Sequence, residues 1–182
     1  MKRIAAMILI LCANIVIGAT TFTGNLLVRP AWTHQKTSGN STTTEALSSM
    51  FYWVHATGTN ANQMTSLFHE QVTLTSGQSR TNNLASITDA FGDTIVFAEV
   101  RVLAFASASA NADAITIGNA SANEFDSWCG GTNHTVTVRP GGFFLTVAPD
   151  LTGYAVSTNG NLKVLNTGTN SVTYEIYVGG SQ

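Results

Sequence analysis

The residue types that carry most enzyme chemistry are present in this chain, but their spacing does not assemble a site. The four histidines are His34, His55, His69 and His134. No two of them are two or four residues apart, the spacings that place two imidazoles on one face of a strand or a helix. Cys129 lies five residues before His134, with Asp126 nearby. A metal site from these three residues would need a fourth ligand from elsewhere, so we interpret the segment as a polar loop with one buried cysteine.

Motifs for nucleophilic catalysis and phosphate binding are missing from the sequence. It contains no GxSxG motif. The run RPGG at residues 139–142 lies between two strand-like segments, whereas a phosphate-binding loop needs a following helix. Asp89, Asp93 and Asp113 are carboxylates that could bind Ca²⁺ in loops, but they lie on separate turns without EF-hand spacing. We therefore expect a protein that is not an enzyme and that has no cofactor and no metal ion.

Aromatic side chains are the remaining candidates for binding. The residues concerned are Trp32, Tyr52, Trp53 and Trp128. Aromatic rings can stack on sugar rings, so these four residues could line a carbohydrate-binding platform. Core and interface packing is the other interpretation, and we favour it because large aromatic side chains dominate cores and interfaces.

The composition excludes one class of partner and suggests a class of protein. Charged residues make up 10% of the chain, and the net charge is −2. The usual charged fraction is about 25%. Thr, Ser, Asn and Gly supply the polarity instead, as is common in extracellular and virion β-proteins. No basic cluster is present, so we expect no binding to nucleic acid through phosphate contacts.

The pattern of the C-terminal half predicts the fold. Residues 136–178 contain five short apolar runs, each closed by turn residues such as those at 139–142 and 157–160. This spacing is typical of an antiparallel sheet that meanders or folds into a sandwich. Residues 94–106 form the strongest strand pattern, and we expect Val96, Val100 and Val102 to face the core. We predict an all-β, jelly-roll-like antiparallel β-sandwich.

One short helix is the exception that the pattern allows. Leu84, Ile87 and Phe91 repeat at helical spacing, Asn83 can cap the start, and Gly92 can end it. The sequence therefore predicts at most one short helix, at residues 83–91.

The N-terminal part divides into two segments before the sandwich domain at residues 45–182. Residues 1–19 have a basic start and an apolar stretch, as a signal peptide does; an apolar N-terminal strand or helix, or a misplaced start, are the alternatives. Residues 20–44 read as an extended polar arm or linker with one edge strand at Leu26–Val28. Residues 50–54 are apolar on both faces, which suits a strand covered on both sides by the opposing sheet or by a neighbouring subunit.

The segment from Val72 to Gly179 resembles small proteins encoded among the structural genes of tailed bacteriophages and prophages. The motifs that carry the resemblance are NLASITDAFG, VFAEVRVLAF, ITIGNASANEF, VTVRPGGFFLTVAPDLTGYAV and LKVLNTGTNSVTYEIYVGG. The resemblance implies a jelly-roll component of the virion, such as a head decoration, fibre or tail-associated protein, and it implies no catalytic residues. The signal-like N-terminus departs from that pattern, because virion proteins are assembled in the cytoplasm.

Two functions follow as expectations. The first is a non-enzymatic structural protein of a phage particle that self-assembles through its sandwich faces and its N-terminal arm. Its partners would be other virion proteins and its own copies, as a homo-oligomer and specifically a trimer. The alternative is a secreted or fibre-borne module that binds carbohydrate or a receptor, with host surface glycans as partners. The location would be the virion, or the extracellular space if residues 1–19 are a signal peptide.

Overall fold

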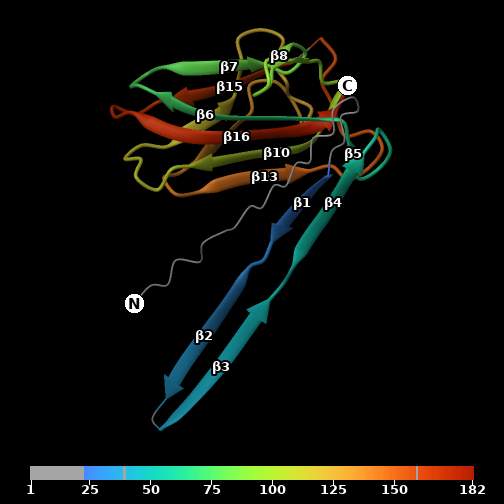
Figure 1. Ribbon diagram of the computed structural model, residues 1–182. Coiled ribbons are helices and arrows are strands. Elements are labelled where there is room, and N and C mark those ends of the chain that lie inside the picture. The colour runs from blue at the N-terminus through green and yellow to red at the C-terminus, as the bar shows by residue number, and fades with distance from the viewer. Residues whose placement is uncertain (1–22, 39, 159) are drawn as a thin grey trace. The chain divides into compact units, whose positions relative to one another are not determined.

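The computed structural model describes residues 23–38, 40–158 and 160–182, and every regular element among them is a β-strand (Figure 1). The segment 1–19, with its predicted signal peptide, lies outside the described residues. In the described part of the chain, no helix is long and apolar enough to cross a membrane. The chain divides into two compact units, Met1–Ala56 and Thr57–Gln182, which are considered separately below.

The larger unit consists of two main antiparallel sheets, preceded by the short β5 (Gln63–Met64). The first sheet contains, in spatial order, β13 (Phe143–Val147), β10 (Glu99–Ser107), β16 (Val172–Ser181) and β6 (Ser66–Leu74), with β14 (Tyr154–Ala155) also paired to β10. The second sheet contains β12 (Thr135–Val138), β11 (Ile115–Gly118), β15 (Asn161–Asn166) and β7 (Ser79–Asn83). The short strands β8 (Ile87–Thr88) and β9 (Thr94–Ile95) pair with each other.

The strands of these two sheets pair in a nested order. Along the chain, the outermost pair is β6 with β16, followed inward by β7 with β15, β10 with β13, and β11 with β12. Successive pairs in this nested order alternate between the two sheets. This arrangement of antiparallel strand pairs is a jelly roll. Figure 1 shows β7 and β15 lying over β6 and β16. The predicted all-β sandwich is confirmed.

The core fills the space between the two sheets, and strict alternation selects its residues. On β16, Val172, Tyr174, Ile176 and Val178 are buried, while the residues between them are partly exposed. Ile115, Ile117, Leu162 and Val164 supply the opposing face from the second sheet. The alternation predicted from residues 172–178 is therefore correct.

The phase predicted for residues 94–106 is correct at Val100, which is fully buried, but wrong at Val96, which is 51% exposed, and at Val102, which is partly exposed. The other buried apolar side chains of this segment are Ile95, Phe97, Leu103 and Phe105. The pairing of β10 with β16 shifts register between Val100 and Val102, a β-bulge that reverses which side chains face the core. Burying phenylalanine rings removes more apolar surface from water than burying valine and alanine side chains does. This difference explains why the face that carries the phenylalanines turns to the core.

The short helix predicted at residues 83–91 does not form. Asn83 ends β7, and its side-chain oxygen accepts a hydrogen bond from Ala85 N at 3.1 Å in a turn, so that it does not cap a helix. Leu84 and Ile87 are buried as the spacing suggested, but Ile87 lies in β8 and pairs with Ile95. Phe91, the third member of the helical pattern, is 74% exposed.

The smaller unit is a long two-stranded ribbon. Its first side is β1 (Thr23–Val28) followed by β2 (Ala31–Ser38), and its second side is β3 (Ser41–Ser48) followed by β4 (Phe51–Thr57). The antiparallel register is the same throughout, from Thr23 opposite Ala56 to Ser38 opposite Ser41. Pro30 interrupts the strands because it lacks an N–H, and Ser49 N donates to its carbonyl at 3.1 Å across the gap. The segment expected to be an extended arm is thus mostly paired strand.

Candidate interaction surface

The ribbon carries most of the large exposed apolar side chains in the part of the chain that the structure describes. Among the described residues, eleven large hydrophobic side chains are exposed, and seven of them lie on the ribbon. These seven are Leu27, Trp32, Leu47, Met50, Phe51, Tyr52 and Val54. Apolar side chains gathered on one exposed element, rather than scattered singly, are typical of an interaction surface.

Cross-strand pairing sorts these residues onto the two faces of the ribbon, because directly opposite residues share a face. One face, named here the stacked face, has Val28 opposite Phe51 and, two pairs along the register, Leu26 opposite Trp53. The Phe51 and Trp53 rings stack there with centroids 6.3 Å apart. Trp32 and Leu47 are opposite each other farther along the same face. An apolar stripe therefore runs along the stacked face across the Pro30 interruption.

The second face of the ribbon is apolar over a shorter length. Leu27 is opposite Tyr52 in the register, and Asn25 is opposite Val54. The Tyr52 hydroxyl donates to Asn25 Oδ1 at 3.3 Å. Both faces near β1 and β4 thus present apolar surface, as the sequence pattern of residues 50–54 indicated. The predicted cover of this strand by an opposing sheet is not seen, because Phe51 and Tyr52 are each 52% exposed.

The half of the ribbon nearest Ser38 and Ser41 is polar, and several of its side chains hydrogen-bond to one another. Gln35 Nε2 donates to Thr44 Oγ1 at 3.2 Å, and the Thr37 and Thr42 hydroxyls are 3.1 Å apart. Every described side chain of β2 and β3 is exposed, and these two strands form a sheet with no third strand. The ribbon therefore has an apolar half, formed by residues 26–32 and 47–54, and a polar half.

The energetics of such a ribbon favour a partner. An isolated two-stranded hairpin is at best marginally stable in water, because it lacks a buried face. Its open edges also present unpaired backbone groups that can pair with another strand. Both deficits are removed when a second surface covers the apolar half.

The four aromatic residues singled out from the sequence fall into two groups. Trp32 and Tyr52 are exposed on the ribbon, where Trp53 is half-buried. Trp128 is only 9% exposed in the jelly-roll core; its Nε1 donates to Phe125 O at 2.8 Å, and its ring meets Phe144 edge-on. Trp128 therefore presents no ring face for stacking on a ligand.

The sequence pattern identified residues 50–54 as a strand that is apolar on both faces, but it did not pair this strand with Leu26–Val28. It also did not single out Leu47, which is 48% exposed. A signal was available: two strand-like runs flank residues 39–40, Gly-Asn, which is a two-residue hairpin connection. Recognising the hairpin fixes the register, and the register places these side chains.

The segment around Cys129 has the features of a structural loop. The Cys129 thiol donates to Asp126 O at 3.3 Å and to Gly131 O at 3.6 Å. Burial raises the pKa of this thiol, and the charges of Glu124 and Asp126 raise it further. His134 Nδ1 lies 3.0 Å from the Cys129 carbonyl oxygen and donates to it. The histidine is thus engaged with backbone and is not paired with the thiol as a base.

Two of the aspartates considered as Ca²⁺ ligands, Asp89 and Asp113, accept hydrogen bonds within the protein. Asp89 Oδ1 accepts hydrogen bonds from Phe91 N and Asp93 N, both at 2.9 Å. Asp113 Oδ2 accepts from Asn170 N at 2.7 Å and Nδ2 at 3.0 Å, and these bonds lower the pKa of its carboxyl group. Over residues 23–38, 40–158 and 160–182, no group of three or more His, Cys, Asp or Glu side chains is arranged to hold a metal ion.

Comparison of the chain with protein-family models, with curated proteins and with solved structures finds no match.

Proposed function

We propose that this chain is a non-enzymatic structural protein that assembles with copies of itself through the apolar half of the ribbon. The observation that supports this most directly is the concentration of exposed hydrophobic side chains between Leu27 and Val54. Burying one such side chain contributes on the order of 1.5–3 kcal/mol. Several of them buried together outweigh the cost of bringing copies into contact.

The charge distribution supports copies of the same chain as the partner. The described part of the ribbon carries only Arg29, Lys36 and Glu45 as charged residues, so two ribbons repel each other little. A symmetric pair uses the same patch on both copies, and an apolar stripe is complementary to itself. A trimer built from the same stripe is the specific assembly that we propose.

The particle to which such an assembly would belong is proposed from the resemblance given above. A head decoration, fibre or tail-associated protein of a tailed bacteriophage would contact other virion proteins as well as its own copies. The jelly roll is compatible with this role, since capsid domains use it, but lectin domains use it too.

A second candidate function is carbohydrate or receptor binding by a secreted or fibre-borne module. The observation that favours it is the exposure of two ring systems suited to stacking on sugars, Trp32 at 58% and Tyr52 at 52%. Self-association would cover these rings, whereas glycan binding requires that they stay open. Their accessibility in solution therefore separates the two functions.

The test of self-assembly is the mass of the purified chain in solution. We expect sedimentation velocity and native mass spectrometry to give an oligomer at micromolar concentration, with three copies for the trimer. Replacing Phe51 by Lys buries a charge in the contact and should weaken association by tenfold or more, about 1.4 kcal/mol. The matched control is Thr42→Lys on the polar half of the ribbon, which should associate as the unchanged chain does.

Two outcomes would overturn the proposal. A chain that stays monomeric at about 100 µM, two decades above a micromolar dissociation constant, does not assemble through the ribbon. Equal weakening by Phe51→Lys and Thr42→Lys would place the contact elsewhere. The particle assignment is tested separately, by mass spectrometry of density-purified phage particles from the source, in which peptides of this chain should be present.

A further inference from the structure

A pocket opens between the edges of the two jelly-roll sheets, and none of its lining residues is used in the proposed assembly. Its volume is about 460 Å³, and β6, β7 and the turn into β8 line it. Phe68 and Ile87 form buried apolar walls, and Thr88 lies at the exposed rim. This volume lies within the range of small-molecule sites, roughly 300–1,000 Å³.

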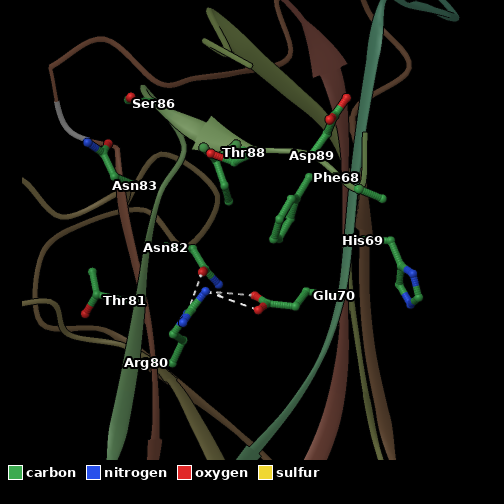
Figure 2. Close-up of a pocket in the computed structure, with 12 residues that line it drawn as sticks. Phe68, His69, Glu70, Arg80, Thr81, Asn82, Asn83, Ser86, Thr88 and Asp89 are labelled. Atoms are coloured by element: carbon green, nitrogen blue, oxygen red, sulfur yellow. Dashed lines mark hydrogen bonds and ion pairs between the residues drawn. The ribbon is translucent and has the colours of Figure 1, made fainter. Parts of the chain in front are cut away.

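An ion pair spans the pocket from one sheet edge to the other. Arg80 Nη2 on β7 donates to both carboxylate oxygens of Glu70 on β6, at 3.1 and 3.2 Å. Figure 2 shows the side chains of Glu70, Arg80 and Asn82 pointing toward one another, whereas His69 points away from them. His69 instead stacks on Tyr177. Three side chains from two sheets therefore converge on one point.

Asn82 holds a buried hydrogen-bond donor that no protein group uses. Its residue is 3% exposed, and its Oδ1 accepts from Arg80 Nε at 3.2 Å. Because Arg80 Nε can only donate, the oxygen of the amide must face it, and the orientation of the amide is fixed. The Nδ2 group then has no partner among the described residues. Unpaired buried donors are rare in folded proteins, and an incoming acceptor is one explanation for them.

The Tyr174 hydroxyl is a second buried polar group without a partner in the described part of the chain. Tyr174 is 1% exposed, and burial raises the pKa of its phenol, with a further increase from the negative charge of Glu70. Tyr174 is not among the residues that line the pocket, so the polar character of the site comes from Asn82 and the Glu70–Arg80 pair.

The chemistry of the lining restricts the ligand. Arg80 balances Glu70, whereas Asp89 accepts only neutral backbone N–H groups, so the lining carries one net negative charge and disfavours an anionic ligand. The lining residues carry both hydrogen-bond donors and acceptors, including the hydroxyls of Thr81, Ser86 and Thr88. A ligand whose groups each donate and accept hydrogen bonds matches such a lining, and sugar hydroxyls do so.

We propose that this pocket binds a neutral saccharide of one or two rings, with Asn82 Nδ2 donating to a sugar hydroxyl beside the Glu70–Arg80 pair. The apolar walls of Phe68 and Ile87 contact the C–H face of a ring. The site does not depend on self-assembly, because none of its residues belongs to the ribbon.

The test is saturation-transfer NMR on the full chain, with glucose, galactose, mannose, N-acetylglucosamine, lactose, maltose and chitobiose as probes. We expect at least one of them to bind saturably, with a dissociation constant on the order of 1 mM or tighter. Tighter binding of a disaccharide than of its monosaccharide identifies the end of a glycan chain as the source, and equal binding identifies a free sugar. The absence of saturable binding by any probe at about 50 mM overturns the proposal.

Variants assign the binding to the pocket. Asn82→Leu keeps the side-chain volume and removes the donor, so affinity should fall about tenfold. Glu70→Gln should reduce affinity several-fold, whereas the matched replacement Glu45→Gln on the ribbon should leave it within about twofold. If Asn82→Leu does not fold, the affinity of Glu70→Gln alone decides whether the saccharide binds in the pocket. Binding that is unaltered by every folded pocket variant overturns the proposal.

Discussion

Arg101 is the side chain on which three separate segments of the jelly roll converge. It is fully buried, at 0% exposure. Its Nη2 donates to Thr59 O at 2.9 Å and to Leu151 O at 2.8 Å, and both Nη2 and Nε donate to Glu99. Ser181 Oγ donates to the same Glu99 oxygen at 2.6 Å, which attaches the C-terminal strand. One buried cation thus joins two loops and a strand end.

We predict that Arg101→Met destabilises the protein by about 3–5 kcal/mol, because it leaves a carboxylate and several carbonyl groups without their donor. Urea unfolding followed by circular dichroism measures the change. The matched control is Arg139→Met at an exposed position, which should change stability by less than about 0.5 kcal/mol. Equal effects of the two replacements would show that Arg101 has no special structural role.

Ionisation of the Tyr177 phenol should lower the stability of the protein at alkaline pH. Burial, and then the hydrogen bond to Glu175 and the charge of that residue, raise the pKa of its phenol to about 12. Because the pKa is raised in the folded state, the stabilisation from the protonated Tyr177 phenol is fully present below the unfolded-state pKa of about 10. This stabilisation is lost as the pH rises through about 12. We expect the urea midpoint to fall in this window.

The ultraviolet titration of tyrosine provides the check on that assignment. Glu175→Gln removes the negative charge beside the phenol, so Tyr177 should ionise at lower pH than in the unchanged chain. Tyr177→Phe should make the decline in stability between pH 10 and 12 shallower. A titration that is identical in the unchanged chain and in Glu175→Gln would contradict the assignment.

At the scale of elements, the close approach of β11 to β12 depends on a glycine. Gly118 has φ +105°, and a Cβ on it would lie 2.3 Å from the carbonyl oxygen of His134, which precedes β12. Both the backbone conformation and the space therefore exclude a larger residue.

We predict that Gly118→Ala destabilises the jelly roll by about 2–4 kcal/mol, from backbone strain together with the clash. Gly77→Ala is the matched control, since Gly77 also has a positive φ, +69°, but a Cβ there meets nothing within 4 Å. It should cost about 1 kcal/mol, the backbone term alone. Thermal unfolding of the two variants separates the steric contribution from the conformational one.

The elements differ in how far the sequence predicts them. On β16 the alternation is regular, so Val172 to Val178 could be assigned to the core correctly. On β10 a single bulge at Arg101 reverses the alternation of buried and exposed side chains, and no local sequence pattern predicts a bulge. Leu84 and Ile87 are buried as predicted, but spacing alone cannot distinguish one turn of helix from a strand end followed by a turn.

The candidate sites were predicted less well, for a physical reason. The exposed apolar surface depends on the register of the ribbon, which the Gly-Asn connection at residues 39–40 would have fixed. The pocket depends on Glu70 and Arg80 meeting across a bend between two sheets. Each residue is unremarkable in the sequence, and only the tertiary arrangement leaves Asn82 Nδ2 without a partner among the described residues.

At the scale of the whole molecule, the hydrophobic core belongs to one of the two units. Every residue of the core cluster lies between Phe68 and Val178. The ribbon contributes none to this cluster, although it carries most of the large exposed apolar side chains among the described residues. Folding and the proposed assembly are therefore assigned to different parts of the chain.

We predict that the chain shortened to Thr57–Gln182 folds by itself and is monomeric. Near-ultraviolet circular dichroism should show fixed aromatic packing, and sedimentation should show a single copy. Oligomers of this shortened chain would contradict the assignment of assembly to the ribbon, and loss of its aromatic signal would contradict the independent core.

The nested strand order also sets when the protein can complete its fold during synthesis. In the outermost pair Thr73 is opposite Thr173, so β6 is synthesised long before its partner strand β16. Contacts between such distant residues make folding slow, and until β16 leaves the ribosome both β6 and β10 have an open edge. A chain that stops before residue 172 would keep those edges open permanently, and truncated products should be captured by chaperones or lost to aggregation.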